Sequence, residues 1–326
     1  MVTAREELLN IRDYTVEFHT ETGVKQAINH LNLTIYKGES LGLVGEAGAG
    51  KTTTALSILR LLPKKSAKIL GGTITYHGED MSGFSERRMQ SIRGEKISMI
   101  FQNPLTSLNP VFTVGEQIAL VFRVHKHMNN HQAFAEAGKL METVGISKER
   151  IYDYPHQFSG GMRQRIGIAA ALACSPELLI ADEPTTALDV TIQAQILELM
   201  KDLQTQYNTS LLMITHNLGI ISELCKYVAV MYAGAIIEYG TVREVFKHPL
   251  HPYTRGLLGA IPTLDDDKES LIAIPGEVAN PYRLPAGCSF NPRCAHCVAE
   301  CTNKTPTLAM VNEDHYVACF SADMLV

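Results

Sequence analysis

The glycine-rich octapeptide at residues 45–52, Gly-Glu-Ala-Gly-Ala-Gly-Lys-Thr, constrains this chain more than any other feature, because it fits the pattern G-x-x-x-x-G-K-[ST]. Apolar residues 41–44 predict a short buried strand before it, and residues 51–62 predict a helix that stops at Pro63. In this setting the glycines let successive backbone N–H groups face phosphate oxygens, and the helix N-terminus adds positive potential. The octapeptide therefore predicts a phosphate-binding loop, in which Lys51 reaches the β- and γ-phosphates of a nucleotide and Thr52 binds Mg²⁺.

Two acidic residues follow the apolar run 178–181, which predicts a buried strand. At the carboxyl end of such a strand, Asp182 can bind Mg²⁺ directly or through water. Glu183 can polarise the attacking water as a general base. A solvated strand end is the common alternative for an isolated acid, but the phosphate loop in the same chain favours the catalytic interpretation.

A second glycine-containing turn, Ser159-Gly160-Gly161, precedes a predicted helix of small residues. Its place at a helix N-terminus also suits an anion. Ser159 is not predicted to be a hydrolase nucleophile, because the G-x-S-x-G elbow needs a glycine where Gln157 stands. Two anion-binding helix ends of one chain can serve the same nucleotide only if they come from different subunits. The two turns therefore predict a head-to-tail dimer with ATP between the subunits.

The order of strand and helix patterns indicates the fold class. Residues 9–36 alternate apolar and polar side chains around a turn at 20–23, which indicates antiparallel strands. Strands and helices then alternate, with strands predicted at 96–101, 177–181 and 210–215 and helical periodicity at 113–148. This order predicts an α/β domain with a mostly parallel core. From about His248 onward proline and glycine become frequent and cysteines accumulate, so we place a domain boundary there.

Composition narrows the classes of function. The chain has 326 residues, of which 45% are hydrophobic, enough for a substantial core. Its formal net charge of −5 argues against a nucleic-acid binder, whose domain usually carries a basic excess. Residues 1–10 lack the apolar core of a secretion signal, and no apolar run reaches the roughly 18–20 residues that span a bilayer. We therefore expect a cytoplasmic protein that reaches a membrane only through a partner.

Taken in order, these motifs resemble those of ABC transporter nucleotide-binding subunits over residues 9 to about 245. Residues 45–52 match the Walker A motif, 178–182 match Walker B with Glu183 following, and 159–162 match the signature motif. Single positions match at the expected places as well: Gln102 in the Q-loop, Asp189 at the end of the D-loop (186–189), His216 in the H-loop, and Phe18 as the aromatic side chain that stacks on adenine.

The resemblance implies an ABC-type P-loop ATPase with a RecA-like core, an antiparallel β subdomain and a helical subdomain at about 103–165. It places the ATPase domain at 1–247 and a small cysteine-rich extension at 248–326. It implies ATP and Mg²⁺ as cofactors, with catalytic roles for Glu183, His216 and Gln102 and a Mg²⁺ site made by Thr52, Gln102 and Asp182. The implied nucleotide-binding residues are Phe18, Gly45, Glu46, Ala47, Gly48, Ala49, Gly50, Lys51, Thr52, Thr53, Ser159, Gly160, Gly161 and Asp189.

The oligopeptide/dipeptide importer subgroup is closely resembled by residues 103–118 and 154–165. It is also resembled by motifs at 251–255 and 285–288 in the C-terminal extension (248–326), called the tail below. The resemblance implies an ATPase at the cytoplasmic face of a membrane that powers import of di- or oligopeptides. Its implied partners are a paralogous ATPase subunit, two transmembrane permeases and, indirectly, an extracytoplasmic substrate-binding protein, with no nucleic acid. Nickel and glutathione importers share the pattern and are alternatives for the substrate. The rival class is a soluble, non-transport ABC ATPase, which typically carries tandem or coiled-coil-bearing domains.

Five of the seven cysteines lie in the tail, between residues 288 and 319. In a cytoplasmic protein they are not expected to form disulfides. Four thiolates suit structural Zn²⁺ or an iron–sulfur cluster, and the C-x₂-C at 294–297 taken alone favours zinc. The importer resemblance implies a [4Fe–4S] cluster on Cys288, Cys294, Cys301 and Cys319, with Cys297 left free. Buried unliganded thiols, and a redox sensor that gates the ATPase, are the alternatives.

Overall fold

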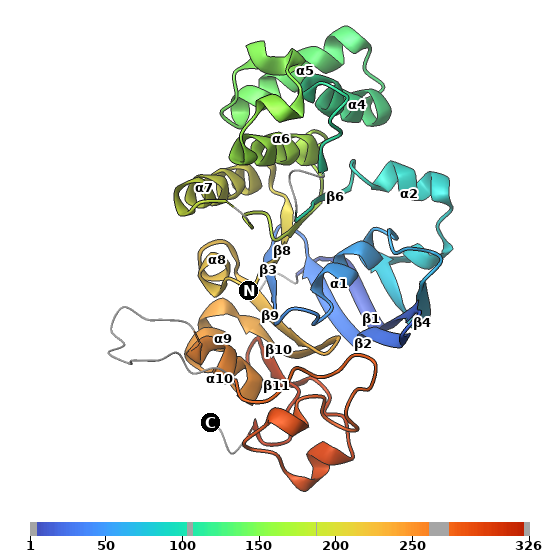
Figure 1. Ribbon diagram of the computed structural model, residues 1–326, viewed down its shortest axis with the longest axis vertical. Coiled ribbons are helices and arrows are strands. Elements are labelled where there is room, and N and C mark those ends of the chain that lie inside the picture. The colour runs from blue at the N-terminus through green and yellow to red at the C-terminus, as the bar shows by residue number, and fades with distance from the viewer. Residues whose placement is uncertain (1–4, 103–106, 187, 261–273, 323–326) are drawn as a thin grey trace. The chain divides into compact units, whose positions relative to one another are not determined.

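The computed structural model describes residues 5–102, 107–186, 188–260 and 274–322, which divide into two units (Figure 1). The helical unit consists mainly of Gly83–Ile214 together with Tyr36–Ser40. The phosphate-loop unit consists of Glu7–Ile35, Leu41–Ser82 and the described part of Thr215–Val326. Among the described residues, no helix combines the length and the apolar character needed to cross a bilayer.

Three parallel strands form the sheet of the helical unit, in the order β6 (Ile97–Ile100), β7 (Leu178–Asp182) and β8 (Ser210–Ile214). Every residue of β7 and β8 is buried. Continuously apolar strands of this kind occur in parallel sheets that are covered on both faces. The prediction of a parallel core is confirmed within this unit, and Asp182 lies at the carboxyl end of β7.

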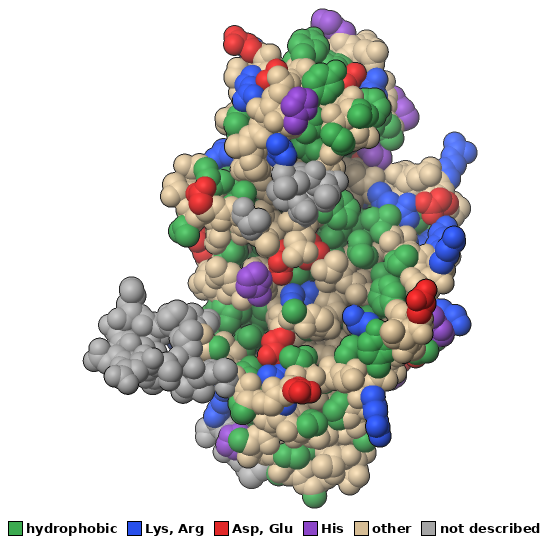
Figure 2. All heavy atoms as spheres, in the orientation of Figure 1, with side chains coloured by type: hydrophobic (Ala, Val, Ile, Leu, Met, Phe, Trp, Pro, Cys, Tyr) green, Lys and Arg blue, Asp and Glu red, His purple; other side chains and the backbone are tan. Residues whose placement is uncertain are grey.

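A helical hairpin of α4 (Val114–Lys126) and α5 (Asn130–Thr143) lies in the region of predicted helical periodicity. Both helices begin at a capping box, in which Thr113 pairs with Glu116 and Asn129 with Gln132. Figure 2 shows hydrophobic side chains at the surface over this hairpin, and Leu120 on α4 is among the exposed ones. The other helices that the structure describes in this unit are α2 (Glu86–Ile92), η2 (Lys148–Tyr152), η3 (Pro155–Gln157), α6 (Gly160–Leu172) and α7 (Val190–Tyr207).

The phosphate-loop unit contains a four-stranded sheet in the order β2-β1-β4-β5. Strands β1 (Glu7–Thr20) and β2 (Gly23–Tyr36) form the predicted hairpin, and β4 (Ala67–Tyr76) pairs antiparallel with both β1 and β5 (Glu79–Asp80). The apolar side chains of β1 that alternate in the sequence, such as Leu9 and Ile11, are buried. The prediction of an antiparallel β subdomain is therefore confirmed.

A second sheet of the phosphate-loop unit has its strands in the order β11-β12-β10-β9-β3. Strand β3 (Ser40–Val44) is parallel to β9 (Tyr227–Tyr232), and β10 (Ala235–Thr241) is antiparallel to β9 and to β12 (His315–Val317). Strand β11 (Ala309–Asn312) pairs with β12 at the edge. The C-terminal segment thus adds two strands to the sheet that carries the phosphate loop.

Helix α1 (Lys51–Ile58) follows the phosphate loop, but it ends four residues before the predicted end at residue 62. Arg60 takes a left-handed φ of 51°, so the backbone leaves the helix before it reaches Pro63. The proline marked the boundary only approximately. Among its described residues this unit has further helices, which are η1 (Met81–Gly83), α8 (Leu218–Leu224), α9 (Val242–Lys247), α10 (Pro252–Gly259), η4 (Asn291–Arg293) and η5 (Ala299–Thr302).

One buried carboxylate, that of Glu238 on β10, connects the C-terminal segment to the sheet. It accepts hydrogen bonds from the N–H groups of Leu250 (2.8 Å) and His251 (2.9 Å). Its Oε1 also lies 2.8 Å from Nε2 of His315 on β12. All three partners lie beyond residue 248, where the sequence predicts the domain boundary. The Glu238 side chain is 0% exposed, so these contacts replace the hydrogen bonds to water that it loses on burial.

Candidate nucleotide-binding site

Two glycines of the phosphate loop are required by packing, and a third is not. A Cβ atom on Gly45 would lie 2.2 Å from the carbonyl oxygen of Met231, and one on Gly50 would lie 2.5 Å from that of Ala27. A Cβ on Gly48 would meet nothing within 4 Å, although its φ of 81° also favours glycine. The loop is therefore pressed against its own unit at both ends and open in the middle, where a phosphate can approach the backbone.

Lys51 begins helix α1 and keeps its ammonium group inside the loop. Its Nζ donates hydrogen bonds to the carbonyl oxygens of Gly45 (2.6 Å) and Glu46 (3.0 Å), and the residue is 8% exposed. Thr52 beside it is exposed. The first turn of α1, all of it described, holds no acidic residue, so nothing there opposes the positive potential of the helix N-terminus. A lysine and a hydroxyl at such a helix end are suited to binding phosphates and Mg²⁺.

Phe18 and His216 lie in the phosphate-loop unit as well. Phe18 is near the end of β1 and is half-buried, which leaves part of its ring accessible for stacking. Tyr14, a second aromatic residue on β1, is 5% exposed, and burial raises the pKa of its hydroxyl. Tyr14 therefore belongs to the core. His216 is exposed and directly precedes Asn217, the N-cap of α8.

The helical unit brings two of the predicted catalytic residues together. Nε2 of Gln102 donates a hydrogen bond to Oε2 of Glu183 (2.7 Å), and the Thr186 hydroxyl donates to the same oxygen (3.0 Å). The N–H of Glu183 donates to the carbonyl oxygen of Ile214 on β8 (2.8 Å). Asp182, the residue before Glu183, is 2% exposed. The structure thus fixes the direction of the Glu183 carboxylate, as a general base requires.

Helix α6 begins at the second glycine turn, where the Ser159 hydroxyl accepts a hydrogen bond from the N–H of Met162 (3.4 Å). A Cβ on Gly161 would lie 2.5 Å from Cγ2 of Ile192, so this glycine lets α6 approach α7 closely. Asp189, predicted in the D-loop, is the N-cap of α7 and accepts a hydrogen bond from the Ile192 N–H (2.9 Å). The sequence prediction gave it only a nucleotide-related role and missed the capping role.

The predicted residues are thus divided between the units: Phe18, residues 45–53 and His216 are in the phosphate-loop unit, and Gln102, residues 159–161, Asp182, Glu183 and Asp189 are in the helical unit. Residues 103–106, which open the segment resembling peptide importers, and Ala187 of the D-loop lie outside the described residues.

The cysteines of the tail gather in one segment. All seven cysteines of the chain lie in its described part, and none forms a disulfide. Burial and, to a smaller extent, the nearby thiols of Cys301, Cys319 and Cys294 raise the pKa of the Cys288 thiol to about 11. Cys297 is exposed. Nevertheless, no three His, Cys, Asp or Glu side chains among the described residues are placed to hold a metal ion. The predicted metal site is therefore not confirmed.

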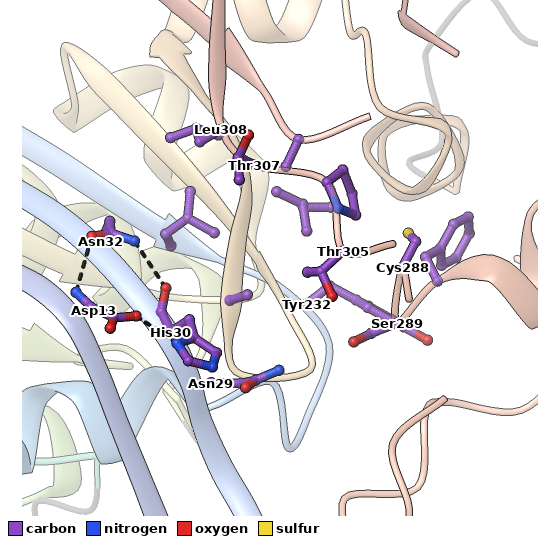
Figure 3. Close-up of a pocket in the computed structure, with 16 residues that line it drawn as sticks. Asp13, Asn29, His30, Asn32, Tyr232, Cys288, Ser289, Thr305, Thr307 and Leu308 are labelled. Atoms are coloured by element: carbon purple, nitrogen blue, oxygen red, sulfur yellow. Dashed lines mark hydrogen bonds and ion pairs between the residues drawn. The ribbon is translucent and has the colours of Figure 1, made fainter. Parts of the chain in front are cut away.

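A cavity of about 510 Å³ lies in the phosphate-loop unit between the β1–β2 hairpin and the tail (Figure 3). Cys288 and Tyr232 line one side of it. On the other side Asp13 and His30 pair with each other, and the Asn32 side chain accepts a hydrogen bond from the Asp13 N–H. Sequence reasoning missed this cavity because its walls come from segments far apart along the chain.

Two residues that touch the phosphate loop also escaped the sequence prediction. The N–H of Glu46 donates a hydrogen bond to the Tyr253 hydroxyl (2.9 Å), and the Glu46 carboxylate pairs with Arg293. Tyr253 lies within the motif at 251–255, which the sequence analysis used only as a mark of resemblance, whereas Arg293 lies in none of the motifs named there. The position of Arg293 next to Cys294 was the one available hint.

The fold is that of an ATP-binding cassette. A family model for ABC transporters matches residues 28–186, and a model for the C-terminal region of oligopeptide/dipeptide transporters matches residues 237–301. A dimeric ATP-binding cassette in a post-hydrolysis state, MJ0796 bound to ADP and Pi, superposes with a TM-score of 0.65 at 24% identity, covering 72% of this chain and 99% of that one. For cbiO1 of Clostridium perfringens the TM-score is 0.63 at 24% identity, with coverage of 74% and 92%.

The similarity to proteins of related sequence extends over almost the whole chain. The oligopeptide transport ATP-binding protein OppD of Salmonella typhimurium is 47% identical over 315 residues, which cover 96% of this chain and 93% of the relative. The oligopeptide transport ATP-binding protein AppD of Bacillus subtilis is 48% identical over 315 residues, 96% of each chain. The chain therefore belongs to the family of oligopeptide-transport ATP-binding proteins of ABC transporters.

Proposed function

We propose that this chain is the ATP-hydrolysing subunit of an ABC importer for di- or oligopeptides. The observation that carries the proposal is the phosphate loop with Lys51 at its centre, in a chain whose relatives are named oligopeptide transport ATP-binding proteins. Nickel or glutathione import is the alternative within the same subgroup. A soluble, non-transport ABC ATPase is the alternative of another class, and the match to the transporter C-terminal region disfavours it.

In this proposal the backbone N–H groups of residues 45–53 and the Lys51 ammonium bind the phosphates of ATP. Thr52, Asp182 and Gln102 would hold Mg²⁺, which would supply positive charge to offset that of the phosphates. Phe18 stacks on the adenine ring, a contact worth about 1–3 kcal/mol in base recognition. The exposure of Thr52 and the partial exposure of Phe18 support these roles.

Hydrolysis then requires a water molecule in line with the γ-phosphate. Glu183 accepts the proton of that water as the general base, and Gln102 and His216 hold the γ-phosphate and the water in place. The hydrogen bond between Gln102 and Glu183 supports a shared role for these two side chains. Displacement of Gln102 toward Mg²⁺ on nucleotide binding would leave the Glu183 carboxylate to the water.

The residues at 159–161 and Asp189 serve the nucleotide of a partner subunit in this proposal. The N-terminus of α6 offers backbone N–H groups, and its fully described first turn carries no acidic residue, which supports binding of a γ-phosphate there. The partner is a paralogous ATPase subunit, so that each ATP lies between two chains.

We propose two permease subunits and, indirectly, an extracytoplasmic substrate-binding protein as further partners, with the chain held peripherally at the cytoplasmic face of the membrane. The helical subdomain, about 103–165, would meet the permeases. Exposed apolar side chains on α4 and just before it support this, because a partner could bury them; they are Val111, Phe112, Leu120 and Val124. The ATPase domain would end at 247 and the extension would cover 248–326.

For the tail, we propose that Cys288, Cys294, Cys301 and Cys319 hold a [4Fe–4S] cluster, with Zn²⁺ as the alternative. Their mutual proximity and the lack of disulfides support a set of four soft ligands. Such a group would require all four thiols to be deprotonated. Iron, zinc and acid-labile sulfide measured on anaerobically purified protein separate the two possibilities, and an absence of both metals contradicts the proposal.

Uptake of labelled peptide by cells that lack this subunit tests the function. Complementation with the wild-type chain is expected to restore uptake of a labelled tripeptide, and the Lys51→Ala variant is expected to restore none. Lys65→Ala, which changes an exposed lysine beyond α1, is the matched control and should behave as wild type. Restored uptake of nickel or glutathione without peptide would replace the proposed substrate, and full peptide uptake with Lys51→Ala would contradict the ATPase role.

A further inference from the structure

A partly buried ion pair between Arg293 and Glu46 joins the tail to the phosphate loop. Nη1 of Arg293 lies 2.8 Å from Oε2 of Glu46, and Nη2 lies 3.2 Å from Oε1. Two parallel contacts of this kind fix direction as well as distance, which a single charge cannot do. The Arg293 side chain is 4% exposed and that of Glu46 is 25% exposed, so solvent screens this pair less than a surface pair.

Glu46 is held from three sides. Arg293 binds its carboxylate, the Tyr253 hydroxyl accepts from its N–H, and its carbonyl oxygen accepts from Nζ of Lys51 (3.0 Å). Lys51 is the residue that the proposed function places on the phosphates. A shift of the Arg293 guanidinium therefore moves the residue on which the Lys51 ammonium rests.

Arg293 is itself fixed by the tail. Its Nε donates to the carbonyl oxygen of Pro275 (3.1 Å), and Nη2 donates to that of Ile274 (3.3 Å). Nη1 lies 3.4 Å from the Tyr232 hydroxyl. These hydrogen bonds hold the guanidinium in place, so the tail helps to set where the Glu46 carboxylate is held.

The backbone of Arg293 belongs to the part of the tail that carries the cysteines, residues 288–319, here called the cysteine segment. It lies in η4, between Cys288 and Cys294. There the Asn291 N–H donates to the carbonyl oxygen of Cys288 (2.9 Å), and the Cys294 N–H donates to the carbonyl oxygen of Asn291 (3.3 Å). The Cys288 N–H in turn donates to the carbonyl of Cys301 (2.8 Å). Cys288 also lines the cavity in Figure 3. Any change in how these thiols are held passes through one short turn to Arg293.

We propose that Arg293 is a positioning residue for the phosphate loop and that it couples the state of the cysteine segment to ATP affinity. The inference rests on the proposed function, because it takes the loop at 45–52 to be the ATP site. The guanidinium holds Glu46 so that the Lys51 ammonium and the loop N–H groups are arranged before ATP arrives. Rearrangement of the Cys288–Cys294 turn releases that arrangement.

Binding of Mg²⁺-ATP to the full chain tests the positioning role. Arg293→Gln is expected to weaken binding about tenfold, within the range of typical coupling between distinct sites. Glu46→Gln should weaken it similarly, and the double variant should be no weaker than either single variant, because both changes break the same pair. Arg283→Gln, at an exposed arginine of the same tail, is the matched control and should bind as wild type.

Steady-state hydrolysis distinguishes positioning from folding. Arg293→Gln should raise KM for ATP while kcat changes less than twofold, since Glu183 lies on another element. An Arg293→Gln variant that unfolds at lower temperature but binds ATP with wild-type affinity would overturn the proposal. Additive losses in the double variant would overturn it as well.

The coupling is tested by Cys294→Ser, a change next to Arg293, made both in the wild-type chain and in the Arg293→Gln chain. It should weaken ATP binding severalfold in the chain with Arg293 and cause no further loss in the Arg293→Gln background. No effect in the first background, or equal losses in both, would overturn the coupling. Lys51→Ala keeps the two proposals apart: if it binds ATP normally, the assigned ATP site is wrong, whereas loss of binding there with a normal Arg293→Gln variant removes only this inference.

Discussion

Glu183 adopts a conformation that few residues other than glycine take, with φ at 47°. Such strain persists only where surrounding bonds fix it, and it gathers at functional positions. Here the backbone is fixed by Ile214 and the carboxylate by Gln102 and Thr186. At the scale of single residues, then, the strongest structural support for catalysis lies beside the Walker B strand.

Replacing Glu183 with Gln should lower ATP turnover by at least about 10²-fold, because the amide cannot accept the proton of the attacking water. The amide keeps the size of the side chain, so ATP binding should persist. Phosphate release under saturating ATP measures the effect. Glu177→Gln, at the other end of the same strand where Glu177 pairs with Lys96, is the control and should stay within twofold of wild type. Near-normal turnover in Glu183→Gln would remove the assignment.

At the scale of elements, sequence patterns correctly predicted the loops and strands that are determined by residues close together in the chain. The loop at 45–52, the β1–β2 hairpin and the strand that ends at Asp182 each depend on a short stretch of sequence, and each is found. The end of α1 was missed because Arg60, not Pro63, breaks the helix.

Contacts between distant segments could not be predicted in this way. Glu46 meets Tyr253 across 207 positions and Arg293 across 247, and no pattern in one sequence pairs such residues. The four tail cysteines, whose spacing suggested ligands, stay a prediction, because no group of three His, Cys, Asp or Glu side chains among the described residues is placed to hold a metal ion.

Helix α10 carries a buried titratable cap. His251 is its N-cap, and Nδ1 accepts a hydrogen bond from the Tyr253 N–H (3.0 Å). Burial lowers the pKa of His251 from 6.5 to about 4, although nearby Glu238 opposes this. The unfolded chain therefore binds more protons than the folded one between about pH 6.5 and pH 4. Above this pH range His251 is neutral in both states and does not reduce the free energy of unfolding. As the pH falls through the range, protonation of the unfolded chain lowers the free energy of unfolding.

We expect the free energy of unfolding to fall by up to about 1.4 kcal/mol per pH unit from this group between about pH 6.5 and 4. Urea unfolding at pH 7 and pH 5 measures the change. His251→Asn retains an N-cap acceptor without a titrating ring. Its free energy of unfolding should therefore fall by about 2 kcal/mol less than that of the wild type between pH 7 and pH 5. Equal losses in both proteins would show that His251 is not the titrating group.

At the scale of the whole chain, the tail is part of the sheet that carries the phosphate loop. Strands β11 and β12 extend that sheet, and Glu238 binds residues at both ends of the tail. The family boundary near residue 237 and the predicted boundary at 248 both fall within this shared structure. The tail should therefore unfold together with the phosphate-loop unit.

Glu238→Ala should destabilise the chain by about 3 kcal/mol, because it leaves the buried N–H groups of Leu250 and His251 without acceptors at about 1–3 kcal/mol each. The midpoint of urea unfolding should fall, and trypsin should cleave faster after Arg255 on α10. Glu277→Ala, at an exposed position of the tail, is the control and should change neither. An unchanged midpoint and cleavage rate in Glu238→Ala would refute the anchoring role.

The central claim is that ATP is bound between two subunits, by the phosphate loop of one and the 159–161 turn of the other. Light scattering of the Glu183→Gln chain, mixed with a paralogous ATPase subunit with and without Mg²⁺-ATP, measures this directly. The mass should rise from that of single subunits to that of a pair only when ATP is present, and Lys51→Ala should abolish the rise. Subunits that bind ATP and still show single-subunit mass, both with the paralogue and alone, would contradict the account.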